Sequence, residues 1–318
     1  MSVVLGRDER SAPPVSAAPT ARAPQRRVAR AGRRRPWLGL LYLAPGLVLY
    51  SLVVLVPAGQ SVWLSFFHWN GVTAATWAGF SNYSGFFGDP TLRAAAEHTL
   101  VFLLFFSAVP VVLGLISAAL SSSKRVRAGG VFRSVVFIPQ TLTPAVTAVV
   151  WKRIYEPDGP INDFLKAIGL GGFARTWLGD YNWALPALGL IGTWAGFGLC
   201  TVLFLAGMQN IPSELYDAAR VDGAGPIREF FTVTLPGLRG PIAVVLTVTV
   251  VGAIRVFDIV WLTTRGGPGT TTVTPTLLLY DRAFTNPDIG SAAAIGVVIS
   301  IISLLVTMVI VKVAGRES

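Results

Sequence analysis

The sequence predicts an all-α integral membrane protein with six transmembrane helices, and three observations carry this prediction. Of the 318 residues, 53% are hydrophobic and only 13% are charged, whereas a soluble domain has roughly 25% charged residues. The apolar residues gather in six stretches that reach the length of about 20 residues that a helix needs to cross a bilayer. A long polar segment, residues 211–241, separates the fourth stretch from the fifth.

The charge and the metal-binding residue types narrow the class of protein further. The net charge is +10, and in a membrane protein an excess of arginine indicates topology before it indicates an anionic partner. No zinc-ligand spacing and no base-stacking module accompany it, so no nucleic-acid partner is expected. Cys200 is the only cysteine, which excludes an intrachain disulfide. Because His68 and His98 are the only histidines, no metal site is expected.

Residues 1–35 form a tail rich in alanine, proline and arginine ahead of the first apolar stretch. The tail has few apolar groups to bury, so we expect it to be disordered. Its charged part is too long for a secretory signal, and the apolar stretch after it has the length of a span. We therefore expect an uncleaved first helix and a cytoplasmic tail, with docking on anionic lipid as an alternative role of the tail.

The six expected spans follow in order along residues 36–318, which we expect to form the transmembrane domain. Their approximate bounds are 37–57, 99–120, 131–151, 183–207, 241–262 and 289–313. The first stretch leads into an amphipathic segment that includes Trp63 and Phe67. Pro139 and Pro144 interrupt the third stretch, because proline removes a backbone donor and clashes with the preceding turn.

The distribution of basic residues predicts the orientation of the spans. Arginine and lysine occur in the tail, in residues 124–133, in residues 211–241, where three arginines accompany four carboxylates, and at the C-terminal end, whereas the remaining loops are balanced or nearly uncharged. Loops rich in lysine and arginine stay in the cytoplasm. We therefore expect both termini and the polar segment between spans four and five to be cytoplasmic, so that a partner of this segment is cytoplasmic too.

The polar segment 211–241 has the pattern of two short helices around a tight turn, and we call it the two-helix loop. Ser213 is placed to cap the first helix. Gly223 is expected to end that helix, since glycine tolerates the positive φ of a helix stop. Pro226 is expected to open the second helix, where a missing N–H is harmless, and Leu235–Pro236 is expected to close the two-helix unit.

Polar residues inside the spans are candidates for a solute path. Arg255 and Asp258 are three positions apart, so a continuous helix would place them on one face. A charge at the centre of a membrane helix costs about 2.5–3.5 kcal/mol on insertion scales. We expect these two residues either to pair with each other or to line the path of a solute. Gln140, between two prolines, is expected to face an aqueous cavity where the helix is irregular.

Span four contributes aromatic and small side chains. Trp194 and Phe197 share a helix face, and they either stack on a sugar ring or pack against other helices. Gly192, Gly196 and Gly198 would let another helix approach closely.

Two loops on the expected outer face contain turn-forming residues beside aromatic ones. They are residues 77–83 and the run Gly266, Gly267, Pro268 and Gly269. These loops either receive a partner that delivers a solute or serve as plain connectors.

The chain lacks the motifs of common enzymes. A phosphate-binding P-loop needs glycine followed by lysine, but the four lysines follow Ser123, Trp151, Leu165 and Val311. Neither Gly-x-Ser-x-Gly nor His-Glu-x-x-His occurs in the sequence. We therefore expect that the chain is not an enzyme and carries no cofactor, and that any ATP is bound by a partner.

The two-helix loop resembles a known signature. The order Asp217-Ala218-Ala219, Gly223 and Leu235-Pro236 is similar to the EAA signature of bacterial ABC-importer permeases. In that family this cytoplasmic loop forms coupling helices that sit in a cleft of the ATPase subunit. The signature usually opens with glutamate, so the shorter Asp217 is expected to shift any ionic contact of the acid. The residues that the resemblance implies for ATPase coupling are Asp217, Ala218, Ala219, Asp222, Gly223, Ala224, Phe230, Leu235 and Pro236.

The resemblance covers about residues 37–313 and looks like carbohydrate-uptake permeases related to the maltose and glycerol-3-phosphate systems. It is carried by FRSVVFIPQTLTPAV from Phe132, WKRIYEPDGPIN from Trp151 and RVFDIVWLTTRGGPGTTT from Arg255. It implies a multi-pass permease subunit of the bacterial cell membrane that forms half of the path for a sugar, an oligosaccharide or a glycerol phosphate. The implied partners are a second permease, an ATPase dimer that holds ATP and Mg²⁺, and an extracytoplasmic solute-binding protein.

Two other functions remain open on the sequence. The first is an ABC permease for another solute class, such as amino acids or phosphate. The run Asp222-Gly223-Ala224, which extends the signature, favours carbohydrates. The second is a self-sufficient channel or secondary transporter, which would need no cytoplasmic ATPase.

Overall fold

The computed structural model describes residues 36–122 and 129–315, so the tail 1–35 and the basic residues 124–127 lie outside the described residues. The chain divides into two compact units between Leu52 and Val53. The first unit contains α1 (Pro36–Tyr50), an apolar helix with Pro45 in its interior. From Tyr42 onward its described side chains are almost all exposed.

The second unit is helical apart from one short hairpin among the described residues. A π-helical turn (η1, Ser51–Leu55) crosses into it and is followed by α2 (Val56–Leu64). The strands β1 (Phe67–His68) and β2 (Thr76–Trp77) pair antiparallel. The next elements are α3 (Ser81–Gly88), α4 (Pro90–Leu103), η2 (Leu104–Ala108), α5 (Val109–Ser122), α6 (Gly129–Thr141), α7 (Pro144–Ile154), α8 (Pro160–Ala167), η3 (Gly171–Phe173) and α9 (Ala184–Met208).

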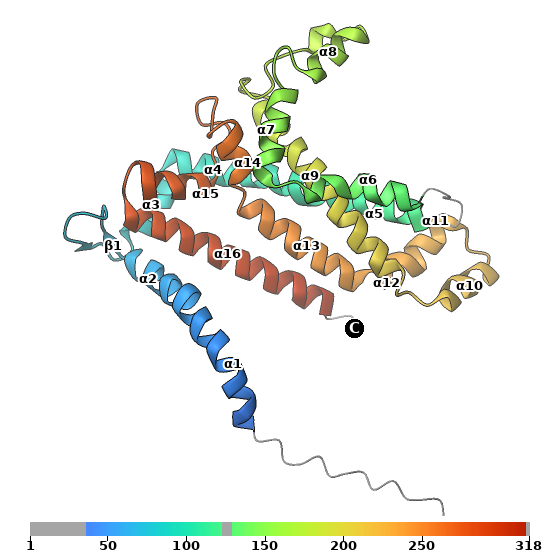
Figure 1. The fold of residues 1–318 in the computed structure, drawn as a ribbon, viewed down its shortest axis with the longest axis horizontal. Helices are drawn as coiled ribbons and strands as arrows, with labels where there is room; N and C mark the ends of the chain where they lie inside the picture. Colours follow the sequence, from blue (N-terminus) through green and yellow to red (C-terminus); the bar gives the residue numbers. More distant parts are fainter. Residues whose placement is uncertain (1–35, 123–128, 316–318) are drawn as a thin grey trace, which may run out of the picture. The chain divides into compact units, whose positions relative to one another are not determined.

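The second half of this unit begins with the short helices of the two-helix loop. They are α10 (Ser213–Val221), α11 (Pro226–Glu229), η4 (Phe230–Thr234) and α12 (Leu235–Gly237). The remaining elements are α13 (Arg239–Ile254), α14 (Asp258–Thr263), α15 (Pro275–Tyr280), η5 (Asp281–Thr285) and α16 (Ile289–Gly315). Within this unit α5 packs along α9, and α13 packs along α16 (Figure 1).

Five helical segments of the described residues are long and apolar enough to cross a membrane. They are Tyr42–Leu64, Pro90–Ser121, Ala184–Met208, Arg239–Thr263 and Ile289–Gly315. A sixth is present if Ser134–Thr141 and Pro144–Ile154, which meet at a bend of 105°, count as one broken span. The predicted helical membrane class is confirmed at this level, and the bend lies where the two prolines were expected to interrupt the helix.

The second of these segments begins earlier than the sequence indicates. Its first turns are polar, so the apolar run at 99–120 does not reveal them. Pro90 opens α4, and the Asp89 carboxylate caps it by accepting the Thr91 N–H at 2.8 Å. A proline in the first turn after an aspartate cap is a favourable helix start.

The predicted fifth span is not one continuous helix, and the expected placement of Arg255 and Asp258 on a single helix face is wrong. α13 ends at Ile254 with Arg255 as its C-cap, and α14 begins at Asp258. Among the described residues no ion pair joins Arg255 to Asp258. The break is stabilised from elsewhere in the chain, because the Thr274 hydroxyl donates to the Val256 carbonyl at 3.2 Å.

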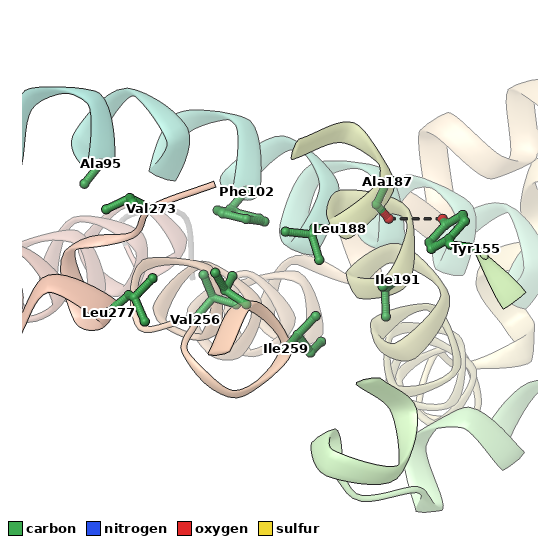
Figure 2. Packing of buried hydrophobic residues seen from close by; sticks show 11 residues of the cluster. Ala95, Phe102, Tyr155, Ala187, Leu188, Ile191, Val256, Ile259, Val273 and Leu277 are labelled. Carbon is green, nitrogen blue, oxygen red and sulfur yellow. Dashed lines mark hydrogen bonds between the residues drawn. The ribbon is translucent and has the colours of Figure 1, made fainter. Parts of the chain in front are cut away.

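One hydrophobic core holds the break in place (Figure 2). Val256, within the break, and Ile259, in the first turn of α14, are buried in a cluster with Phe102 of α4 and Leu188 of α9. The Tyr155 hydroxyl, just beyond α7, donates to the Ala187 carbonyl of α9 at 3.1 Å. The cluster therefore joins α4, α7, α9 and the α13–α14 break into one packed body.

Close helix packing elsewhere depends on glycine. A Cβ atom on Gly192 of α9 would lie 2.1 Å from the Phe106 ring, and a Cβ atom on Gly198 would lie 2.2 Å from the Val136 carbonyl of α6. The expectation that these two glycines allow close approach is confirmed. Gly196 is less confined, because its Cβ would lie 3.6 Å from Pro110. Cys200 is fully buried in a second cluster with Phe204, as a small apolar side chain.

Hydrogen bonds from hydroxyl groups join the π-helical turn η2 to α9 and α13. The Ser107 hydroxyl lies 2.7 Å from that of Thr249 on α13. The Thr193 hydroxyl of α9 donates to the Phe105 carbonyl at 2.6 Å. Hydrogen bonds of this kind between membrane helices satisfy polar groups that have no water to bind.

Candidate functional site

The turn of the two-helix loop has the geometry that its glycine predicts. α10 ends at Val221, and Gly223 adopts φ +76°. Its N–H donates to the Arg220 carbonyl at 3.0 Å, and the Ala224 N–H donates to the Ala219 carbonyl at 2.9 Å. These bonds satisfy carbonyl groups at the helix end, as in helix stops with a left-handed glycine. Pro226 opens α11 as predicted.

One local prediction for this loop is wrong. Ser213 does not cap α10, because it is the first residue of the helix and Pro212 occupies the cap position without a side-chain hydrogen bond. Leu235–Pro236 lies at the close of the unit as predicted, since α12 ends at Gly237 and α13 begins at Arg239. Pro236 lies in the first turn of α12, where no backbone donor is needed, and the Leu238 N–H bonds back to Thr234 at 3.0 Å.

A salt bridge between the two short helices was not apparent from the sequence. The Arg220 guanidinium donates from Nε and Nη2 to the two carboxylate oxygens of Glu229, at 3.1 and 3.2 Å. Nη1 also donates to Asp217 at 3.2 Å. Glu229 is mostly buried, with 19% of its side chain exposed. This fork-shaped pairing fixes the angle between the helices, and it raises the pKa of Arg220 through the hydrogen bond and charge of Glu229.

The exposed surface of the two-helix loop combines acidic groups with apolar side chains. Val221 is 87% exposed and Ile227 is 77% exposed, and Leu215 is also exposed. Of the residues expected to act in coupling, Asp217, Ala218, Asp222, Gly223 and Pro236 are exposed, whereas Ala219, Ala224, Phe230 and Leu235 are half-buried. Exposed apolar groups on a polar loop indicate a surface that binds another protein.

A cavity of about 440 Å³ lies where the α6–α7 helix is broken. Gln140 lines it from α6, and its side chain is exposed. Gly192 and Gly196 line the cavity from α9, and Gly252 lines it from α13. The expectation that Gln140 faces a cavity at an irregular helix is confirmed. Irregular backbone at membrane depth is tolerated where it faces such a cavity.

The structure does not bring the other predicted path residues into this cavity. Trp194 packs edge-on against Trp151, with ring centroids 5.5 Å apart. Neither Trp194, Phe197 nor Asp258 belongs to the lining of either large cavity among the described residues. Arg255 lines a second cavity on another face of α13.

The Gly266–Gly269 segment is a tight turn that is fixed by hydrogen bonds. Gly266 and Gly269 have φ values of +91° and +58°, and the Gly267–Pro268 peptide is cis. The buried Thr272 hydroxyl donates to the Gly267 carbonyl at 2.8 Å. A Cβ on Gly269 would lie 3.3 Å from the Tyr181 ring, so the turn packs against the loop that precedes α9.

The described residues contain no group of three histidine, cysteine, aspartate or glutamate side chains that could hold a metal ion.

Long apolar helices, a broken helix at a cavity and an exposed polar loop between two spans together define a membrane permease subunit. Residues 110–316 match the family described as "Binding-protein-dependent transport system inner membrane component". The chain belongs to this family, and it is accordingly a transport component of the inner membrane.

Relatives of known name and structure agree with this assignment. The chain is 36% identical over 275 residues to the "Probable ABC transporter permease protein YurN" of Bacillus subtilis (strain 168), covering 86% of this chain and 94% of the relative. It is 34% identical over 292 residues to the "Alpha-glucoside transport system permease protein AglF" of Rhizobium meliloti (strain 1021), covering 89% and 83%.

A solved structure shows the same fold. It is a bacterial alginate ABC transporter in complex with an alginate pentasaccharide-bound periplasmic protein. Its matching chain has a TM-score of 0.74 and 21% sequence identity, with 89% of this chain and 96% of that chain covered.

Proposed function

We propose that the chain is the permease subunit of an ATP-driven ABC importer for carbohydrates, such as a sugar, an oligosaccharide or a glycerol phosphate. The observation that carries this proposal is the two-helix loop between two long apolar helices. Arg220 links its two short helices, and the loop exposes Val221 and Ile227 to a partner. The alpha-glucoside system named for one relative supports a carbohydrate as the solute.

Membrane topology is part of the proposal. We count the bent pair α6–α7 as one span, so that six spans cross the bacterial cell membrane with both termini in the cytoplasm. The arginine-rich tail and Lys312 and Arg316 at the C-terminal end support the cytoplasmic position of both termini, and four spans after the tail return the two-helix loop to the same side. Residues 1–35 then form a cytoplasmic tail, and residues 36–318 form the permease domain.

The two-helix loop is proposed to dock in a cytoplasmic ATPase dimer, which binds ATP and Mg²⁺. The residues proposed for this contact are Asp217, Ala218, Ala219, Asp222, Gly223, Ala224, Phe230, Leu235 and Pro236. Asp217 bonds to Arg220 on its own helix, so its shorter side chain is engaged within the loop. ATP-driven closure of the dimer would push the loop as a rigid piece and tilt the spans that flank it.

The Arg220–Glu229 pair is expected to matter for this transmission. Reversing one charge, in Arg220→Glu or Glu229→Arg, is expected to lower the ratio of uptake to ATP hydrolysis by about two- to fivefold, because the pair is partly exposed and solvent screens it. The double exchange Arg220→Glu with Glu229→Arg should restore much of the ratio. If the double variant is no better than the single ones, the pair does not transmit the motion.

The cavity at the α6–α7 break is proposed as this chain's half of the solute path, completed by a second permease subunit. Gln140→Leu removes a hydrogen-bonding side chain from it and is expected to reduce uptake about two- to tenfold. Gln209→Leu, at the exposed end of α9 outside the cavity, makes the same chemical change and should have no effect. Unchanged uptake in Gln140→Leu would remove this cavity from the path.

The turn Gly266, Gly267, Pro268 and Gly269 is proposed as a docking point for an extracytoplasmic solute-binding protein. Support comes from its rigidity and from its contact with the exposed Tyr181. Trp194, Phe197 and Asp258 lie outside both large cavities, so the proposed path does not depend on them.

One purification tests the function as a whole. The tagged chain, extracted from its native membrane, is expected to bring with it an ATPase and a second permease. The complex should hydrolyse ATP faster when the loaded binding protein is added, and calorimetry on the binding protein should identify a carbohydrate. An amino acid or inorganic phosphate as ligand would overturn the solute class, and absence of an ATPase would overturn the importer.

A further inference from the structure

A second cavity, of about 490 Å³, lies between α13, α15 and α16. It is separate from the cavity at the α6–α7 break, because Thr249 and Gly252 of α13 line the first cavity whereas Val251 and Arg255 line the second. The remaining lining residues are Thr276, Leu279, Gly296, Ile299, Ser300, Ser303, Leu304 and Thr307.

Among the described residues that line this cavity, Arg255 supplies the only formal charge. It is the C-cap residue of α13, and its side chain is exposed. No carboxylate lines the cavity, and within the described part of the chain Arg255 makes no ion pair. A guanidinium group at a membrane span normally pairs or faces a polar cavity.

Two buried hydroxyl groups in the same lining also find no partner in the described part of the chain. Thr276 Oγ1 on α15 and Ser303 Oγ on α16 are buried without a hydrogen bond to any described residue. The neighbouring Ser300 and Thr307 hydroxyls instead donate to the carbonyl groups of Gly296 and Ser303, each at 2.8 Å. Buried polar groups are rarely left unpaired, because each then loses its hydration without replacement. The two hydroxyls therefore indicate a ligand with acceptor atoms.

The rest of the lining indicates an apolar part of that ligand. Val251, Leu279, Ile299 and Leu304 supply aliphatic walls. The neighbouring surface of α16 is apolar and exposed, since Ile301, Ile302 and Leu305 point away from the packed core. In a membrane-spanning helix, such a surface meets lipid hydrocarbon.

We propose that this cavity binds one anionic phospholipid. The Arg255 guanidinium bonds the phosphate oxygens, because its planar donor fork matches phosphate geometry. The hydroxyls of Thr276 and Ser303 donate to further oxygens of the lipid, and an acyl chain lies along the aliphatic walls. This inference does not rest on the transported solute, since the cavity is separate from the proposed path.

The test uses the whole purified complex in detergent and counts bound lipid by native mass spectrometry during titration with phosphatidylglycerol. Arg255→Gln is expected to weaken the tightest-bound lipid about tenfold or more, because a charge-assisted hydrogen bond is lost. Thr276→Val with Ser303→Ala should weaken it further. Arg255→Lys keeps the charge and should retain part of the affinity, which shows that the folded complex is intact.

A matched control removes a different guanidinium. Arg265→Gln acts on an arginine that lies over the Trp261 ring, outside the cavity lining, and should leave the lipid affinity unchanged. Equal binding of phosphatidylcholine, or an unaltered affinity in Arg255→Gln, would overturn the proposal. Displacement of the lipid by equimolar inorganic phosphate would show a free anion as the ligand and would also overturn it.

Discussion

Replacing Gly223 with proline is expected to reduce carbohydrate uptake at least tenfold while the chain remains inserted in the membrane. Gly223 has φ +76°, and its N–H bonds the Arg220 carbonyl. Proline fixes φ near −65° and has no N–H, so the turn cannot keep its shape. A Cβ at this position would meet no atom of the described residues within 4 Å, so the effect arises from the backbone and not from crowding.

The neighbouring Gly225 offers a matched control. It has φ −75° and likewise has open space where a Cβ would be placed. Gly225→Ala should therefore transport normally. Uptake, the amount of chain in the membrane and ATP hydrolysis are measured together, and the coupling role predicts that hydrolysis continues without uptake in Gly223→Pro. Deleting residues 217–224 should have the same result. Normal uptake in either variant would show that the two-helix loop does not couple ATP hydrolysis to transport.

Gly198→Ala is expected to destabilise the folded chain by about 1–3 kcal/mol, as overpacking of a dense interior does. The added Cβ would lie 2.2 Å from the Val136 carbonyl oxygen, which belongs to the backbone of α6. A backbone atom cannot rotate out of the way, so α6 as a whole must move away from α9. Because α6 carries Gln140, the shift is expected to alter the proposed solute path as well.

The effect is measured as thermal stability of the purified complex in detergent. Gly196→Ala is the control on the same helix, because its Cβ would lie 3.6 Å from Pro110, an ordinary contact distance. Gly192→Ala should fall between the two, since its nearest neighbour is the Phe106 side chain, which can rotate. If Gly196→Ala and Gly198→Ala unfold at the same temperature, close approach of α6 is not what Gly198 provides.

Local features of this protein could be predicted from the sequence, since they depend on a few adjacent residues. The bend between α6 and α7 follows from Pro139 and Pro144, and the stop at Gly223 follows from the backbone freedom of glycine. The position of Gln140 at a cavity could also be predicted, because Gln140 lies beside this break and helix breaks expose polar groups that need a wet or buried setting.

Contacts between residues distant in sequence were not predicted. The apolar run at 241–262 predicts one helix, but the Thr274 hydroxyl donates to the Val256 carbonyl, and the cluster around Phe102 buries Val256 in the break and Ile259 in α14. That break separates Arg255 from Asp258. The Arg220–Glu229 bond is similar, because it depends on how the turn at Gly223 directs α11.

The sequence by itself determined the membrane class, the approximate position of the spans and the two-helix loop, because hydrophobic length and turn residues act locally. Only the tertiary structure decided which side chains share a cavity. Gln140 and Arg255 were both expected on one path, yet they line separate cavities with α13 contributing to each. The physical reason is packing, since the direction of each side chain depends on where a helix ends and which neighbour it meets.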